Sequence, residues 1–399
     1  MKKEKTMMAL YVGCLAVLCA CTESQEFSNE EGNNDPVELQ INPTMTLTGG
    51  GARDASTTSN FGNDATIGVF AVGADASNTN YGNGNNYAVY KHSGTEAGNW
   101  SADASSTHIY LTSEVATIYA VSPSSVVTSA PSDAVTATST VNIETFAGGA
   151  DAIDTSNGGD NLITAAQSAT NDINIAPGET DYLYAGGTPP QASNGKEGGS
   201  SPKTSSVNLT MEHALAMVSF RVYKTANYKG AGHLTKIQMK NSSASTSSST
   251  TWKLQKAGSG SATMQIGDGT IALGTEADIT YTRFIHQTRA GDNTDKYYEL
   301  KEAGQNESTT ATVPAFGILL YSIAWTSGDN SDIEVIFTVD GTGYTVPLAL
   351  DRAWVKGNNY IYSATLDGEG LSLGSVTITD WKSTSISNGL DLIEKPENP

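Results

Sequence analysis

The sequence has no cysteine beyond position 21, few basic residues and no apolar run of transmembrane length. Its three cysteines lie within the first 21 of 399 residues, so the rest of the chain offers no thiol for a disulfide, a metal site or a nucleophile. Lysine and arginine number 22 against 42 acidic residues, and the formal net charge is −20 at pH 7. Acidity of this size keeps a protein soluble and repels nucleic acid and anionic lipid, so neither is an expected partner.

Recognisable catalytic and metal-binding patterns are also missing. Glycine and serine alternate at 258–261, which gives only half of a nucleophile elbow without the strand-to-helix setting that the elbow requires. The acidic loop at 151–161 departs from the regular spacing of a calcium loop. No HExxH or HxH arrangement joins the five histidines, His92, His108, His213, His233 and His286. We therefore expect no enzymatic activity, no cofactor and no metal site.

The N-terminus has the features of a bacterial export signal. Three lysines precede an apolar run at residues 7–18, which is too short for a bilayer core of about 30 Å but suits a signal peptide spanning residues 1–20. Leu18 to Cys21 resembles a lipobox, which predicts acylation of Cys21 and a membrane attachment through lipid alone. An ordinary cleaved signal is the alternative. Residues 21–36 are polar and acidic, and so predict a flexible tether.

The next stretch, residues 37–53, predicts an edge strand followed by a glycine cluster and an arginine. Apolar residues alternate with polar ones from Val37 to Ile41, and Pro43 favours an edge position over a central one. Arg53 is the only arginine before Arg221. A protease that cut after Arg53 would leave Asp54 as the new N-terminus and would remove the strand. An ordinary loop arginine is the alternative.

The remaining sequence favours an all-β fold. Forty glycines with abundant serine, threonine and asparagine favour turns and strands over helices. Strand-like runs recur with glycine turns, including Asp-Gly dipeptides at 268–269 and 340–341, and two runs at 108–111 and 115–121 predict a hairpin. Since single cores rarely exceed about 250–300 residues, we expect two β-sandwich domains. Their predicted bounds are 37–225 and 226–399.

Several of these segments resemble one bacterial family. The resemblance rests on the lipobox leader, GNDATIGVFAV at 62–72, DYLYA at 181–185, VNLTMEHALAMVSFRV at 207–222, and WVKGNNYIYSATL with VTITDW at 354–366 and 376–381. These motifs are similar to those of the fimbrillin family of Bacteroides-type bacteria, which supplies major and minor subunits of surface fimbriae, also called type V pilins. The motifs are short packing signatures that are spread over nearly all of the chain after the leader.

The resemblance implies tandem sandwiches of transthyretin-like Greek-key topology and export to the outer membrane as a lipoprotein. It also implies removal of the N-terminal strand by an Arg-specific protease at Arg53, followed by insertion of a strand from the C-terminus of another subunit. The candidate donor here is residues 385–393, in which Ile386, Leu390, Leu392 and Ile393 are the side chains expected to face a groove. A frayed terminus is the alternative for this segment.

The sequence thus predicts a non-enzymatic pilin that builds surface fimbriae for adhesion and biofilm formation. Its expected partners are related subunits, the processing protease and an unidentified surface receptor. One alternative is a tip or anchor subunit of the same fimbriae. The other is a glycan-binding lipoprotein that presents the aromatic residues Tyr81, Tyr87, Tyr90 and Trp100 to sugar.

Overall fold

The computed structural model shows an all-β protein. It describes residues 36–45, 61, 64–73, 81, 86–93, 99–129, 135–145, 147, 173–174, 179–195, 203–242, 251–287, 296–303, 315–324, 330–348, 352–368, 370–380 and 393–394. Within these ranges helical geometry is confined to the 3-10 turn η2 (Ser124–Val126) and to Tyr81, which also has 3-10 geometry, and no helix is long and apolar enough to cross a bilayer. The all-β prediction is therefore confirmed.

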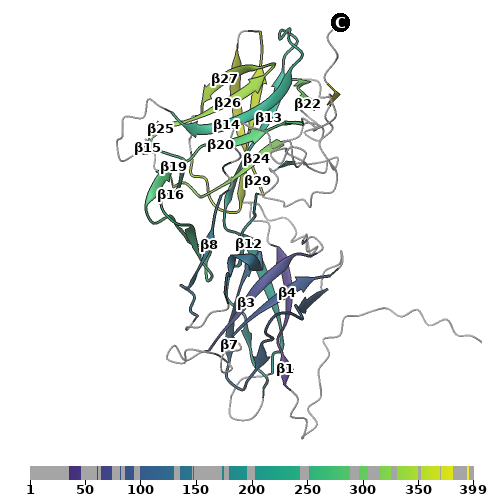
Figure 1. Cartoon of the computed structure of the whole chain (residues 1–399), viewed down its shortest axis with the longest axis vertical. Coiled ribbons are helices and arrows are strands. Elements are labelled where there is room, and N and C mark those ends of the chain that lie inside the picture. The colour runs from purple at the N-terminus through teal and green to yellow at the C-terminus, as the bar shows by residue number, and fades with distance from the viewer. Residues whose placement is uncertain are drawn as a thin grey trace, which may run out of the picture. The chain divides into compact units, whose positions relative to one another are not determined.

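One large sheet contains the N-terminal strand at its edge. Figure 1 shows its strands β3, β4 and β7 side by side. The strands in spatial order are β2 (Gln40–Met45), β12 (Ser206–His213), β10 (Leu183–Ala185), β7 (Ala116–Ser122), β3 (Thr66–Gly73), β4 (Tyr87–His92) and β5 (Trp100–Ala102). Two short strands, β1 (Val37–Glu38) and β6 (Tyr110–Leu111), pair beside it, and β11 (Gln191–Ala192) pairs with β7.

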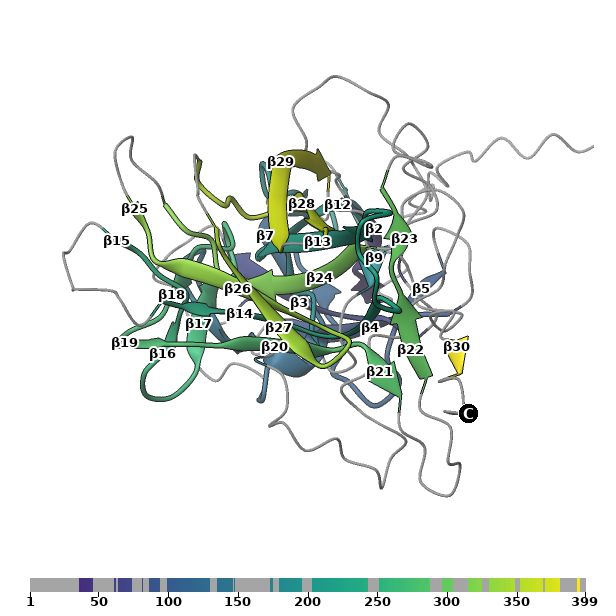
Figure 2. The same cartoon turned by 90° about the horizontal axis from the view of Figure 1, so that it is seen from above.

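Two further sheets are built mainly from the second half of the chain. They are seen from above in Figure 2. The first contains, in spatial order, β29 (Leu371–Asp380), β28 (Asn358–Leu366), β13 (Ala216–Lys224), β24 (Ala315–Leu320) and β9 (Ile173–Asn174), with β23 (Lys301–Glu302) beside β13. The second contains β21 (His286–Gln287), β22 (Lys296–Glu299), β14 (His233–Asn241), β26 (Ile333–Val339) and β27 (Thr342–Pro347), with β20 (Tyr281–Phe284) beside β14 and β30 (Ile393–Glu394) beside β22.

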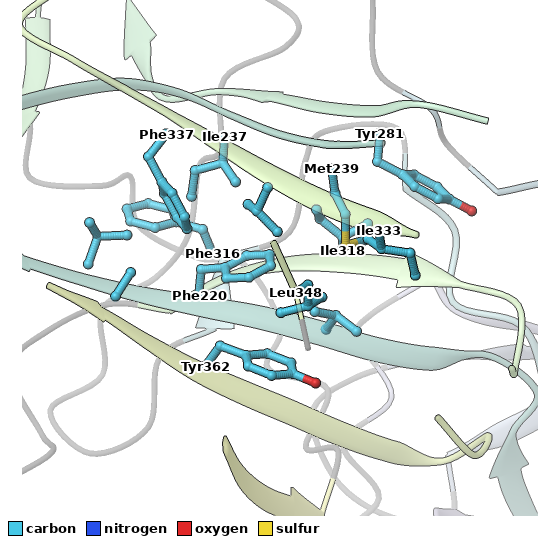
Figure 3. Close-up of a cluster of buried hydrophobic side chains, with 14 of the residues drawn as sticks. Phe220, Ile237, Met239, Tyr281, Phe316, Ile318, Ile333, Phe337, Leu348 and Tyr362 are labelled. Atoms are coloured by element: carbon cyan, nitrogen blue, oxygen red, sulfur yellow. The ribbon is translucent and has the colours of Figure 1, made fainter. Parts of the chain in front are cut away.

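An aromatic and aliphatic core joins these two sheets (Figure 3). Phe220 of β13 packs edge-on against Phe337 of β26, with ring centroids 5.5 Å apart, and stacks with Tyr362 of β28 at 5.9 Å. Alternating burial along β26, in which every second residue is buried, shows how a period-2 sequence places one face on this core. The second half of the chain is thus a sandwich of two sheets.

Smaller strands connect the sheets. The sheet formed by β18 (Ile271–Ala272), β17 (Ala262–Gln265) and β8 (Thr140–Ile143) shares a buried cluster with Phe70 of β3 and Met217 of β13. Two pairs complete the fold: β15 (Thr251–Trp252) with β25 (Asn330–Ser331), and β16 (Gln255–Ala257) with β19 (Glu276–Asp278).

The structure confirms two predicted turns and corrects one hairpin. Asp340 and Gly341 have φ of 48° and 79° and connect β26 to β27, as expected for a two-residue turn that needs positive φ at both positions. Gly269 (φ 66°) lies between β17 and β18. The predicted hairpin of 108–111 with 115–121 is wrong, because β6 pairs with β1 whereas β7 pairs with β3, β10 and β11.

Strand pairing crosses the predicted domain boundary at 225/226. Only two residues separate β12 from the next sheet, since β13 begins at Ala216 and pairs with β24 and β28. In addition, β8 and β9 come from the first half of the sequence but pair with β17 and β24. The small polar segment at 224–233 therefore lies between β13 and β14, which belong to the two packed sheets of the C-terminal sandwich.

Truncating the central aromatic residue of this sandwich should strongly destabilise it. Phe220→Ala removes a fully buried ring and leaves a cavity, so we expect a loss of about 3–5 kcal/mol in the free energy of unfolding. Urea denaturation measures this loss. The matched control is Ile378→Ala, where the side chain is 44% exposed and the expected change is within about 0.5 kcal/mol. Similar losses for both variants would contradict the assigned core.

Candidate functional site

The candidate site is the groove that Val37–Met45 fills. The strand β1 runs antiparallel to β6, with Val37 opposite Leu111, and the amide of Leu39 donates to the carbonyl of Ile109 at 2.9 Å. The strand β2 then runs parallel to β12, with Met45 opposite Met211. Because β12 is the only strand that pairs with β2 among the described residues, β2 is an edge strand, as predicted.

The sequence alternation explains how the strand sits in this groove. Leu39, Ile41 and Pro43 are buried, whereas Gln40 and the other residues between them are exposed. A proline has no amide to contribute to a ladder, and an edge strand tolerates this loss. One face of a nine-residue segment therefore points inward, as the period-2 pattern predicts.

Apolar burial holds the strand. Leu39 is 1% and Ile41 is 3% exposed, and both belong to the same hydrophobic cluster as Leu209 and Met211 of β12. At roughly 1.5–3 kcal/mol for each fully buried aliphatic side chain, these two residues contribute about 3–6 kcal/mol of gross stabilisation. Val37 and Met45 pack partly against the cluster as well.

Polar contacts fix the position of the strand along the groove. The Tyr90 hydroxyl donates to the carbonyl of Leu39 at 2.5 Å, and Asn42 donates to the Ser206 hydroxyl at 2.9 Å. His108 Nδ1 lies 2.7 Å from Glu38 Oε1. Their side chains are 33% and 38% exposed, so this pair contributes at most about 1 kcal/mol.

The pKa of Tyr90 reflects this environment. Burial raises it above its usual value, and the nearby Glu38 charge raises it further. The folded state therefore favours the neutral phenol, which donates the hydrogen bond to Leu39. That contribution to stability is complete below the unfolded-state pKa of about 10 and is lost as the pH rises through the folded-state pKa.

Removing the strand would leave an empty groove that could accept another strand. The backbone edges of β6 and β12 would lose their partners, and the apolar side chains beneath Leu39 and Ile41 would face water. An unpaired edge beside an apolar floor is the geometry that β-strand addition uses.

Most of the other predicted site residues lie outside the described part of the chain. They are Cys21, Arg53, Asp54, Ile386, Leu390 and Leu392. Ile393 is described only as part of β30, where it pairs antiparallel with Tyr297 of β22. The acidic loop at 151–161 also lies outside the described residues.

The aromatic residues proposed for sugar stacking are not presented to solvent. Tyr81, Tyr87 and Tyr90 are 2%, 8% and 2% exposed. Trp100 is partly buried and packs edge-on against Phe61, with ring centroids 5.1 Å apart. That expectation is corrected: these side chains pack within the sheet and its adjacent loops.

The histidines whose side chains are described contact carboxylates or rings instead of forming a cluster. His213 Nδ1 lies 2.9 Å from Asp181 and His92 packs on Trp100 at 5.0 Å. Within the described ranges, no three histidine, cysteine, aspartate or glutamate side chains come together as metal ligands would. The role of His108 in contacting Glu38 was missed from sequence, because the two residues are 70 positions apart.

A separate cleft of about 820 Å³ lies beside the C-terminal sandwich. Its walls include the apolar side chains of Ile271, Ile323 and Val355. The Lys356 ammonium at its rim lies 4.4 Å from the ring centroid of Tyr184 and donates to the backbone carbonyl of Asp268. Its charge is therefore already engaged within the chain.

Comparison with known proteins identifies the family. The fimbrillin-like family matches residues 54–381, so the chain belongs to that family, which is structural and non-enzymatic. A solved Bacteroides ovatus protein assigned to cell adhesion has a TM-score of 0.51 at 12% identity, covering 88% of this chain and 100% of its own. At that identity the similarity concerns the fold alone.

Two further solved structures are similar over most of the chain. A fimbrial protein from Bacteroides vulgatus has 11% identity and a TM-score of 0.41, with coverage of 86% of this chain and 99% of its own. The fimbrial anchor protein Mfa2 from Porphyromonas gingivalis has 10% identity and a TM-score of 0.35, with coverage of 86% and 98%. No curated protein matches in sequence.

Truncating the most buried side chain of the strand should open the groove. Leu39→Ala should lower the opening free energy of β2 by about 2–5 kcal/mol, because the substitution leaves a cavity beneath the strand. Hydrogen exchange of the amides in β2 and β12 measures this opening. Gln40→Ala is the matched control, since Gln40 is exposed and its truncation should change exchange little. Equal acceleration in both variants would contradict the burial pattern.

Proposed function

We propose that the chain is a structural subunit of cell-surface fimbriae that is assembled by exchange of strands between subunits. The observation that carries this proposal is the edge strand Val37–Met45, which fills an apolar groove just before Arg53. In this proposal a protease cuts after Arg53, the strand leaves, and a strand from another subunit enters. The polymer serves adhesion and biofilm formation.

The bounds of the family match support this sequence of events. The match begins at Asp54, the residue that cleavage after Arg53 would leave at the N-terminus. The groove-filling strand therefore lies wholly before the matched region. If the assembled subunit lacks this strand, we expect the strand to lie outside the matched region, as Val37–Met45 does.

Cleavage changes the competition for the groove. While the chain is intact, the covalent bond to the rest of the protein keeps the strand at a high effective concentration near its groove. After cleavage the strand is a separate peptide and can be diluted away. A donor strand that buries four or five side chains could then gain on the order of 10 kcal/mol, enough for a durable polymer.

Membrane attachment through acylated Cys21 is part of the same proposal. An uncut subunit would stay on the outer membrane through its lipid, whereas a subunit cut after Arg53 would be free to enter the fibre. Chains that begin at Cys21 at the cell surface would thus indicate an anchor subunit, and chains that begin at Asp54 a stalk or accessory subunit.

Blocking the cut should block assembly. We expect the wild-type protein, treated with an Arg-specific protease, to begin at Asp54 and to form SDS-resistant ladders on gels. Arg53→Ala and Arg53→Lys should both stay uncut and monomeric, while the lysine variant keeps the charge and serves as the control for electrostatic effects. N-terminal sequencing and gel electrophoresis measure both steps. Ladders from an uncut variant would overturn the proposed role of Arg53.

A further inference from the structure

The cleft beside the C-terminal sandwich has the edge of a strand as one wall. Each residue from Gly269 to Gly274 lines it, although successive side chains of a strand point to opposite faces. No residue of β17, the partner of β18, lines it. The cleft therefore borders β18 on the side that faces away from β17. In the described part of the chain β18 is the last strand of its sheet, so this side has no partner strand.

The backbone of β18 offers hydrogen-bonding groups to the cleft. The amide of Gln265 donates to the carbonyl of Thr270 at 2.9 Å, so the backbone of Thr270 points at β17. At the next position Ile271 and Met264 form a non-hydrogen-bonded pair of the antiparallel ladder. The amide and the carbonyl of Ile271 therefore point away from β17. Burial alternates as far as Leu273, which extends the same geometry by two residues.

Two loops that are joined to each other form the opposite wall. Ile323 and Trp354 exchange two backbone hydrogen bonds of 2.9 and 3.0 Å. Val355 follows, lines the cleft and is 48% exposed, more than any other large apolar side chain in the described residues. The space between the walls, about 820 Å³, falls within the range of about 300–1,000 Å³ that is usual for ligand pockets. A ligand that covers Val355 removes this apolar surface from water.

Lys356 contributes little net charge to the cleft. Its ammonium donates to the carbonyl of Asp268 and lies 4.4 Å from the ring centroid of Tyr184. Burial lowers the pKa of Lys356, and the nearby carboxylates of Asp268 and Glu212 balance its charge. An anionic ligand would therefore meet a cation that acidic residues of the chain already neutralise.

Glu276 is the other charged residue of the cleft, and it favours a cation. Its carboxylate accepts a hydrogen bond from the neutral amide of Gln255. Within the described ranges, no lysine or arginine lies at ion-pair distance from it. Asp278 is two residues further along β19 and so points to the same face of that strand. The two carboxylates therefore give this side of the cleft a negative charge.

We propose that this cleft binds an extended segment of a partner protein, with apolar side chains at alternate positions and a lysine or arginine beside them. The segment adds to the edge of β18, its apolar side chains cover Val355, and its basic side chain pairs with Glu276. The net charge of −20 favours encounter with a basic segment over an acidic one. No residue of β1, β2, β6 or β12 lines the cleft, so this inference does not rest on strand exchange between subunits.

Synthetic peptides test the chemistry of the ligand. The probe is RTVTVTR, blocked at both termini, whose arginines and valines share one face of an extended strand. We expect the full chain to bind it at least tenfold more tightly than RTSTSTR, which lacks the apolar side chains. It should bind QTVTVTQ about two- to fivefold more weakly than the probe, because the ion pair is lost. Fluorescence anisotropy measures the binding, and equal affinity for the three peptides would overturn the proposal.

N-methylated peptides distinguish strand addition from simple adsorption of apolar side chains. Alternate residues of an added strand direct their amides at the neighbouring strand, and the others direct them away. One version of the probe carries methyl groups on the amides of its threonines, and the other carries them on the amides of its valines. One of the two should lose at least tenfold in affinity, whereas the other should stay within twofold of the probe. Equal losses in both would contradict addition to β18.

Substitutions in the chain locate the bound peptide. Val355→Ser should weaken binding of the probe at least threefold, whereas the matched control Ile378→Ser, at a side chain that is 44% exposed on β29, should leave it unchanged. Glu276→Gln should weaken the probe about two- to fivefold and leave QTVTVTQ unaffected. All three side chains are exposed, so the thermal midpoints should match that of the wild type. Undiminished binding by Val355→Ser, or equal weakening of both peptides by Glu276→Gln, would overturn the assignment of the cleft.

Discussion

The burial of Leu39 and Ile41 against β12 is the contact on which the proposed biology depends. Through this contact the strand, which is paired on one edge only, becomes part of the hydrophobic cluster. A strand that was only hydrogen-bonded at an edge would exchange its partner for water at little cost, because the net contribution of each such bond is about 1 kcal/mol. Apolar burial supplies the additional stabilisation that holds the strand in place. It would also make the vacated groove a strong acceptor for another strand.

Much of this arrangement was predictable from local sequence. The alternation from Val37 to Pro43 predicted an edge strand, and its buried and exposed faces are those of the period-2 pattern. The Asp340-Gly341 dipeptide predicted its turn, because positive φ at two successive positions favours these residue types. The all-β class followed from composition and turn spacing. In each case the residues that determine the feature lie within a few positions of one another in the sequence.

Longer-range features were not predictable in the same way. The residues around Tyr110 have a strand pattern, but this pattern does not decide between two partners. The structure pairs them with Val37–Glu38, whereas the sequence suggested the strand that follows them. Tyr90 and His108 contact the strand across separations of 51 and 70 residues. The aromatic residues between positions 81 and 100 lie in a polar, glycine-rich sequence that suggested exposure, yet tertiary packing buries Tyr81 and Tyr87. Such contacts depend on which strands meet, which a single sequence leaves open.

The direct passage from β12 to β13 has a mechanical consequence. The groove borders β12, and after two intervening residues the same backbone enters a strand that is paired on both sides, by β24 and β28. In a fibre whose subunits are joined at this groove, tension applied along an inserted strand would act parallel to β12. Its hydrogen bonds would then be loaded together in shear instead of being opened one at a time. The pull would pass along one continuous backbone into the C-terminal sandwich, which would spread it across a large core.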